Sequence, residues 1–228
     1  MIVLGLSTAE QGGSLAIVDG DRLICQEFWD TKQTHSKRLL DMIRHMVENR
    51  SGLDLADIDA YVAARGPGSF TGLRIGISAI KGLAYAMGKP ALGASSLDGI
   101  AFRFAYSSIP VCVMMDAKRD EVYAAVYRFE KGMMVSKSTE RVIDPGKVVA
   151  EMPASSLYAG SGSKAYLPVI EKNAEDPVIA HPYMDSICAV SLIRSLGKGS
   201  TDLNPAESPL EPVYIRKSDA ELNSALKD

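Results

Sequence analysis

The sequence predicts an α/β protein made of two tandem halves, each with the element order β-β-β-α-β-α-β-α. Short apolar runs bounded by polar or turn residues recur along the chain, as expected of buried strands. Between them lie segments whose apolar residues are three and four positions apart, which is typical of helices that pack on a sheet. The order of elements in residues 1–108 starts again at residue 109, so the halves are predicted to be a structural repeat.

The first half has clear boundary signals. Asp19-Gly20 lies between two apolar runs and predicts a hairpin, because glycine accepts the positive φ that the turn demands. Gly52 is placed as the residue just after a helix, and Gly88 ends a second, longer helix. The predicted elements are strands 2–6, 14–18 and 22–29, helix 34–50, strand 58–64, a long helix that ends near 87, strand 90–94 and helix 97–106.

The second half repeats this order with little sequence similarity to the first. Lys131-Gly132 predicts the turn between its second and third strands, and Pro145 marks the start of a short helix. The predicted elements are strands 111–115, 121–129 and 133–143, helix 146–151, strand 156–160, helix 163–173, strand 177–181 and helix 187–197.

Three regions follow from this pattern: an N-terminal half at 1–108, a C-terminal half at 109–198 and a tail at 199–228. The tail is rich in Pro, Ser and Asp, and we expect its EPVYIR segment to dock back on the fold in an extended form.

Composition favours a soluble cytoplasmic protein. Of the 228 residues, 46% are hydrophobic and 23% charged, and the net charge of −3 argues against a large nucleic-acid surface of its own. Cys25, Cys112 and Cys188 are widely separated, which argues against disulfides and for a reducing compartment. The N-terminus lacks a signal-peptide pattern, and no apolar stretch approaches the ~20 residues of a membrane span.

The stretch GPGSFTGLRIG, residues 66–76, resembles a phosphate-binding loop but matches neither common type. No lysine follows its glycines as the P-loop requires, and Gly66, Gly68 and Gly72 do not have the dinucleotide spacing. We interpret it as a strand-to-helix turn, with Ser69 or Thr71 as helix cap and an anion contact at Ser69 or Arg74 left open.

This motif resembles the signature of the TsaB (YeaZ) family, within the actin-like ATPase superfold. The resemblance continues in STAEQGGSLAIVDGD, THSKRLL, MDAKRDEVYAAVY and EPVYIR, and therefore covers nearly the whole chain. It implies a non-catalytic scaffold subunit that dimerises with TsaD and supports threonylcarbamoyl transfer to the tRNA adenosine beside the anticodon. It also implies that TsaE joins through the complex and that tRNA binds only through the complex.

The resemblance predicts no metal site. The two metal-binding histidines of TsaD correspond here to Ser96 and Ile100, which are poor substitutes for imidazole. His35, His45 and His181 are not spaced to rebuild such a site.

A nucleotide site is predicted to be vestigial. Of the three loops that hold ATP in the superfold, the first carries no acid at Leu6-Ser7-Thr8, and the second, MMDAKRDEV, has no glycine for close approach to phosphate. The third, AGSGS, is read either as an adenosine loop or as a plain turn with Ser161 or Ser163 as helix cap. We expect no required cofactor and leave weak binding of ATP or ADP open. The candidate contacts are Ser7, Thr8, Gly12, Gly13, Gly160 and Gly162.

The family also implies a docking face for TsaD, or for a second copy of this chain when it is alone, on the helices at 34–50 and after residue 69. Each glycine inside a helix lowers helix stability by roughly 1 kcal/mol relative to alanine. The glycines of the second helix are therefore expected to allow either close packing within the chain or close approach of a partner. The candidate interface residues are His35, Leu39, Leu40, Ile43, Met46, Gly72, Gly76 and Ala79.

Two alternative functions remain: a free-standing ATPase or small-molecule kinase of the same superfold, and, less favoured, a glycoprotease-like peptidase. The absent acid and glycine-free loop disfavour the first. The second lacks the G-x-S-x-G motif.

Overall fold

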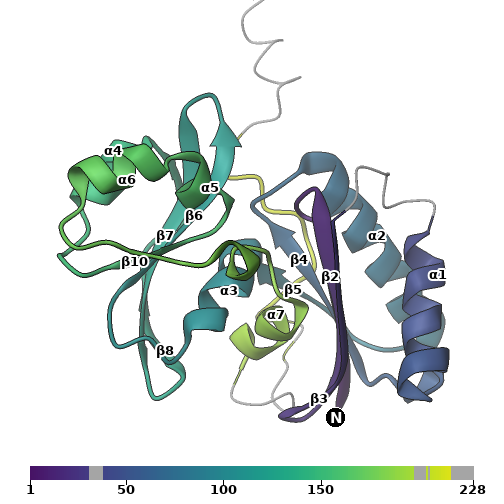
Figure 1. The fold of residues 1–228 in the computed structure, drawn as a ribbon. Helices are drawn as coiled ribbons and strands as arrows, with labels where there is room; N and C mark the ends of the chain where they lie inside the picture. The colour runs from purple at the N-terminus through teal and green to yellow at the C-terminus, as the bar shows by residue number, and fades with distance from the viewer. Residues whose placement is uncertain (31–37, 198–203, 205, 217–228) are drawn as a thin grey trace, which may run out of the picture.

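A computed structural model describes residues 1–30, 38–197, 204 and 206–216, and shows two lobes, each built on one sheet (Figure 1). The N-terminal sheet has the strand order β3-β2-β1-β4-β5, with β1, β2 and β3 antiparallel and β4 and β5 parallel to β1. Its strands are β1 (Ile2–Ser7), β2 (Gly12–Asp19), β3 (Arg22–Asp30), β4 (Ala60–Gly66) and β5 (Ala91–Ser95).

The C-terminal sheet repeats this topology, with the order β11-β10-β6-β7-β8. Counted within its own half, each sheet therefore reads 3-2-1-4-5, which confirms the predicted repeat. The single third strand predicted at 133–143 is two strands, and both pair with β7. The strands are β6 (Val111–Lys118), β7 (Glu121–Glu130), β8 (Met133–Lys137), β9 (Arg141–Ile143), β10 (Leu157–Ala159) and β11 (Val178–Ile179).

The helices begin and end largely where their local signals indicate. Ser69 accepts a hydrogen bond from the Gly72 N–H at 3.2 Å and caps α2, and Gly88 ends it in the left-handed conformation. The predicted helix at 163–173 is two helices that meet at Tyr166. The helices are α1 (Leu39–Arg44), α2 (Phe70–Met87), α3 (Ser96–Ala101), α4 (Pro145–Ala150), α5 (Ser161–Ala165), α6 (Leu167–Asn173) and α7 (Ala189–Ser195).

The helix predicted at 34–50 is irregular. After α1 the chain continues as a π-helix, His45–Ser51, which ends at Gly52 with φ 71°. The predicted residues 34–37, including His35, lie outside the described part of the chain. Short 3-10 turns complete the structure at Leu55–Asp57, Phe102–Phe104 and Pro182–Met184.

The helix α2 lies on the N-terminal sheet through the predicted apolar stripe. Leu73, Ile77, Ile80 and Ala84 are buried, whereas Met87 at the end of the stripe is half-buried. Figure 1 shows α1 and α2 side by side on one face of this sheet, and α3 and α7 on the side toward the other lobe.

The last helix, α7, comes from the second half of the sequence but packs on β1, β2 and β4 of the first. Its Ile193 side chain lies against Gly5 of β1, where a side chain on residue 5 would collide with it. The chain therefore crosses from one lobe to the other before the tail begins. Among the described residues, no helix is both long and apolar enough to cross a membrane.

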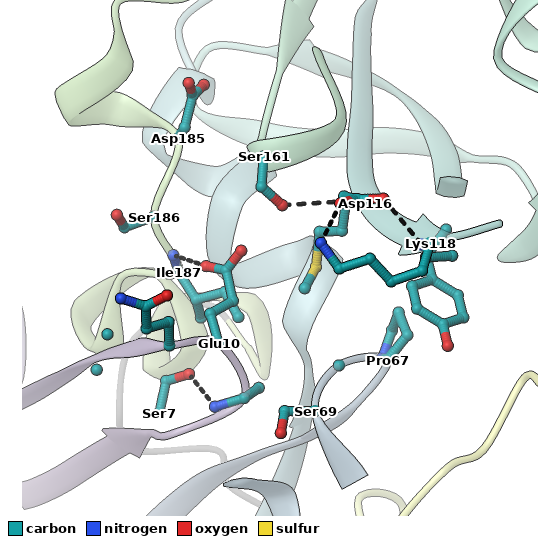
Figure 2. Close-up of a pocket in the computed structure, with 18 of the residues that line it drawn as sticks. Ser7, Glu10, Pro67, Ser69, Asp116, Lys118, Ser161, Asp185, Ser186 and Ile187 are labelled. Carbon is teal, nitrogen blue, oxygen red and sulfur yellow. Dashed lines mark hydrogen bonds and ion pairs between the residues drawn. The ribbon is translucent and has the colours of Figure 1, made fainter. Parts of the chain in front are cut away.

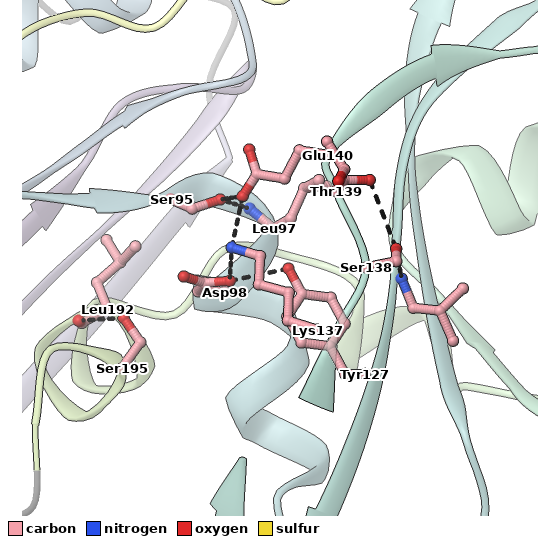
Figure 3. A network of polar contacts seen from close by, with 11 residues as sticks. Ser95, Leu97, Asp98, Tyr127, Lys137, Ser138, Thr139, Glu140, Leu192 and Ser195 are labelled. Atoms are coloured by element: carbon pink, nitrogen blue, oxygen red, sulfur yellow. Dashed lines mark hydrogen bonds and ion pairs between the residues drawn. The ribbon is translucent and has the colours of Figure 1, made fainter. Parts of the chain in front are cut away.

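A buried polar network also joins the lobes (Figure 3). Lys137, at the end of β8, forms ion pairs with Asp98 of α3 at 2.6 Å and with Glu140 at 2.7 Å. Tyr127 donates to Asp98 at 2.8 Å, and Ser95 donates to Glu140. Burial raises the pKa of Asp98, and the Lys137 ammonium opposes that rise.

The tail segment 208–216 crosses from the edge of the N-terminal sheet to the C-terminal lobe. Gly93 of β5 donates to the Ser208 carbonyl at 2.9 Å, and the Val213 N–H donates to the Arg65 carbonyl at 2.7 Å. Arg216 then donates to the Ala117 carbonyl of β6 at 2.8 Å. The segment predicted to dock therefore does so, and it spans both halves.

Candidate functional site

A cleft of about 960 Å³ lies between the two lobes (Figure 2). Its walls come from the loop after β1, the start of α2, the β6–β7 turn, α5, the segment 182–187 and the tail residues 213–216. Charges of both signs line it: Glu10, Asp30, Asp116, Lys118, Arg119, Lys164, Asp185 and Arg216.

Glu10 carries a carboxylate into the cleft from the loop between β1 and β2. It accepts a hydrogen bond from the Ile187 N–H at 3.4 Å. Burial raises the pKa of Glu10, and the nearby Ser161 hydroxyl and Ile187 N–H partly offset the rise. The sequence prediction considered only Leu6-Ser7-Thr8 as the place for an acid, so it missed Glu10, three residues beyond Ser7.

Ser161 and Asp116 form the C-terminal wall beside Glu10. The Asp116 N–H donates to the Ser161 hydroxyl oxygen at 3.2 Å. The Asp116 carboxylate accepts from the Lys118 N–H at 2.8 Å and pairs with the Lys118 ammonium at 2.6 Å. Hydrogen bonding to Asp116 raises the pKa of Lys118.

Asp185 accepts a hydrogen bond from the Gly160 N–H at 2.9 Å. Burial raises the pKa of Asp185. Neither predicted serine caps α5 with its side chain, since Gly160 is the capping residue. Gly160 and Gly162 lie against the Met114 backbone and do not line the cleft, so the prediction that they contact nucleotide is corrected. Ser161 and Lys164 are the cleft-lining residues of α5.

Only some residues of the first predicted phosphate loop line the cleft. Ser7, Gly12 and Gly13 line the cleft, with Gly13 packed against the Trp29 ring. Thr8 does not line it: the hydroxyl is buried and donates to the Gly72 carbonyl at 2.8 Å, which corrects the prediction for that residue.

The second predicted phosphate loop is a tight two-residue turn between β6 and β7. Lys118 pairs with Glu121 across it, and Lys118, Arg119 and Asp120 all have positive φ, at 61°, 56° and 59°. Such turns usually contain glycine or asparagine. All three residues carry side chains, so the prediction remains that this turn keeps the backbone away from an incoming phosphate.

The glycines of the opening motif face inward. A Cβ at Gly72 or Gly76 would lie under 3.0 Å from Thr8, closer than real Cβ atoms come, and one at Gly68 would meet Ala9. They let α2 approach the loop after β1, so the internal-packing explanation is correct for these positions.

Most of the predicted docking residues therefore belong to this chain's own interior. Leu39, Ile43, Met46, Gly72 and Gly76 are buried, so the prediction that they face a partner is corrected. Leu40 is 57% exposed and Ala79 is half-buried, and both stay accessible. His35 lies outside the described residues.

Within the described residues, no three His, Cys, Asp or Glu side chains are grouped to hold a metal ion. Asp116, from the glycine-free segment MMDAKRDEV, lies in the cleft. The sequence gave no signal for Asp185, which meets Gly160 only through the tertiary fold.

Two lobes with repeated 3-2-1-4-5 sheets and a cleft between them define the class: a protein with the actin-like ATPase fold. The family model described as TsaD, tRNA N6-adenosine threonylcarbamoyltransferase, matches residues 29–196. The chain belongs to the TsaB (YeaZ) family, as its sequence resemblance indicated.

Three relatives support this assignment. The tRNA threonylcarbamoyladenosine biosynthesis protein TsaB of Escherichia coli K12 is 32% identical over 96% of both chains. The Haemophilus influenzae protein of that name is 29% identical over 95% of this chain and 94% of its own length. The structure of YeaZ from Pseudomonas aeruginosa is 31% identical, with a TM-score of 0.76 over 93% of this chain and 99% of that one.

Proposed function

We propose that this protein is a non-catalytic subunit that docks onto TsaD in the cytoplasm and supports threonylcarbamoyl transfer to the tRNA adenosine beside the anticodon. Relatives named as tRNA threonylcarbamoyladenosine biosynthesis proteins support the pathway, and the match to the TsaD family model supports a shared architecture. The observation that carries the docking role is Tyr85 of α2, which is 90% exposed.

Tyr85 belongs to a solvent-facing row on α2. Arg74, Ser78, Gly82 and Tyr85 follow one another at helical spacing and are all exposed. The row combines a large amphipathic ring with small residues, which suits close approach of another helix around an aromatic anchor.

The neighbouring helix α1 adds Leu40, which is 57% exposed, to the same side of the sheet (Figure 1). We infer that TsaD covers Leu40, Ala79 and Tyr85. When the chain is alone, a second copy would use the same residues. TsaE and tRNA would then meet this subunit only within the assembled complex.

One feature of the cleft supports a non-catalytic role over an ATPase or kinase: the β6–β7 turn offers side chains where a kinase needs open backbone. We propose that the chain requires no nucleotide and binds ATP or ADP weakly at most. The peptidase alternative gains no support from the cleft, because no His lines it among the described residues.

The test is binding to TsaD, measured by calorimetry, followed by tRNA modification with the full set of components. Tyr85→Glu and Leu40→Glu should each weaken binding by roughly 30-fold or more, as expected of an anchor residue. Tyr106→Glu is the matched control, because Tyr106 is 78% exposed but lies against the β7–β8 turn at Gly132. If Tyr85→Glu and Leu40→Glu bound TsaD and supported tRNA modification as the wild type does, the helix face with Leu40 and Tyr85 would not be the docking site. Ile43 and Gly76 are unsuitable sites, since changes there disturb the fold itself.

A further inference from the structure

The Glu10 carboxylate lies in the cleft between the two lobes (Figure 2). Glu10 comes from the first half of the chain, whereas its donor, the Ile187 N–H, and the neighbouring Ser161 hydroxyl come from the second half. The Ser161 oxygen accepts a hydrogen bond from the Asp116 N–H. Polar groups from the second half of the chain therefore surround the Glu10 carboxylate.

These donors are of the kind that binds phosphate. Backbone N–H groups and hydroxyls that converge on one point stabilise an anion there. Lys118, Arg119 and Lys164 also line the cleft and add positive charge around it. The carboxylate of Glu10, which belongs to the chain itself, already lies against the Ile187 N–H and the Ser161 hydroxyl.

Two other acids of the cleft, Asp185 and Asp116, also interact with groups of the chain itself. Asp185 uses the Gly160 N–H, and Asp116 is paired with Lys118. An entering phosphate would have to displace Glu10 and would meet its negative charge at short range, where repulsion between like charges is strong.

We propose that Glu10 is the specificity-determining residue of the cleft, an internal carboxylate that takes up the polar groups a ligand phosphate would use and thereby excludes phosphate-bearing ligands. This inference does not depend on the docking face, because it concerns only the isolated chain.

The test is a calorimetric titration of the isolated chain with inorganic pyrophosphate. Glu10→Ala should bind at least about tenfold more tightly than the wild type, because both the repulsion and the competitor for the donors are gone. Glu10→Gln, which keeps the size and one acceptor, should show a smaller gain in the same direction. Asp30→Asn is the matched control: it removes the same charge from an exposed position on the cleft wall, and should change affinity by less than about threefold.

A second measurement covers the case in which Glu10→Ala loses stability. Acetate at tens of millimolar should raise the melting temperature of Glu10→Ala by refilling the vacated site, and should leave that of the wild type unchanged. No gain in pyrophosphate affinity for either Glu10 variant, or an equal gain for Asp30→Asn, would overturn the proposal. Since TsaD is absent from both measurements, their failure is distinct from failure of the docking proposal.

Discussion

Replacing Gly72 by alanine should destabilise the protein, although the same change at Gly82 of the same helix should stabilise it. Alanine is favoured over glycine in a helix by roughly 1 kcal/mol at either position. At Gly82, which is exposed, a Cβ would meet nothing within 4 Å, so most of this gain should be realised. At Gly72 the Cβ would collide with the backbone carbonyl of Thr8.

The size of the effect follows from that contact. The added Cβ would lie 2.0 Å from the Thr8 carbonyl oxygen and ordinary van der Waals contact requires 3.4–4 Å, so α2 and the loop after β1 would have to separate by about 1.4 Å or more. Overpacking of this kind costs about 1–3 kcal/mol, and loss of the Thr8–Gly72 hydrogen bond adds about 1 kcal/mol. After the helix gain is subtracted, Gly72→Ala should lose about 1–3 kcal/mol of stability.

The assay is paired thermal and urea unfolding of Gly72→Ala, Gly82→Ala and the wild type. For a chain of this length each kcal/mol shifts the melting temperature by about 2–4 °C, so Gly72→Ala should melt about 2–12 °C below the wild type. Gly82→Ala should melt slightly above it. If Gly72→Ala were as stable as Gly82→Ala, the conclusion that the motif's glycines serve internal packing would be refuted.

Two further predictions concern the cleft. Asp120→Gly should stabilise the chain by about 0.5–1 kcal/mol in urea unfolding, because residue 120 has φ 59°, whereas Asp21→Gly, in a turn position without positive φ, should not. Glu10 has a raised pKa in the folded state, so its contribution to stability should fall as pH rises from about 4.5 through that pKa. Unfolding measured across this range should therefore show Glu10→Gln becoming more stable relative to the wild type toward neutral pH. The comparison removes the contributions of groups that both proteins share, and a pH-independent difference would contradict the assignment.

Local signals predicted much of the fold. The hairpin at Asp19-Gly20, the Ser69 cap and the apolar stripe on α2 each depend on residues close in sequence, and each is present. The repeat of the element order along the chain was also predicted from the sequence, because apolar runs and helical spacing recur in both halves. The third strand of the second half and the helix at 163–173 were each predicted as one element and are two.

The candidate site was harder to predict because its contacts join distant parts of the chain. Periodicity showed that Gly72 and Gly76 share one side of α2, but not whether that side meets Thr8 or a partner. Glu10 and Ile187 are 177 residues apart in sequence and meet only when α7 and the segment before it cross to the first lobe.

By itself, the sequence determined most of the element order and the repeat, because local backbone preferences and hydrophobic periodicity act over a few residues at a time. Its motifs indicated the family. The tertiary structure alone decided which small residues are interior, that Tyr85 faces solvent and that Glu10 occupies the floor of the cleft. Those outcomes depend on packing and hydrogen bonding between segments far apart in the chain, and local preferences carry no information about such pairings.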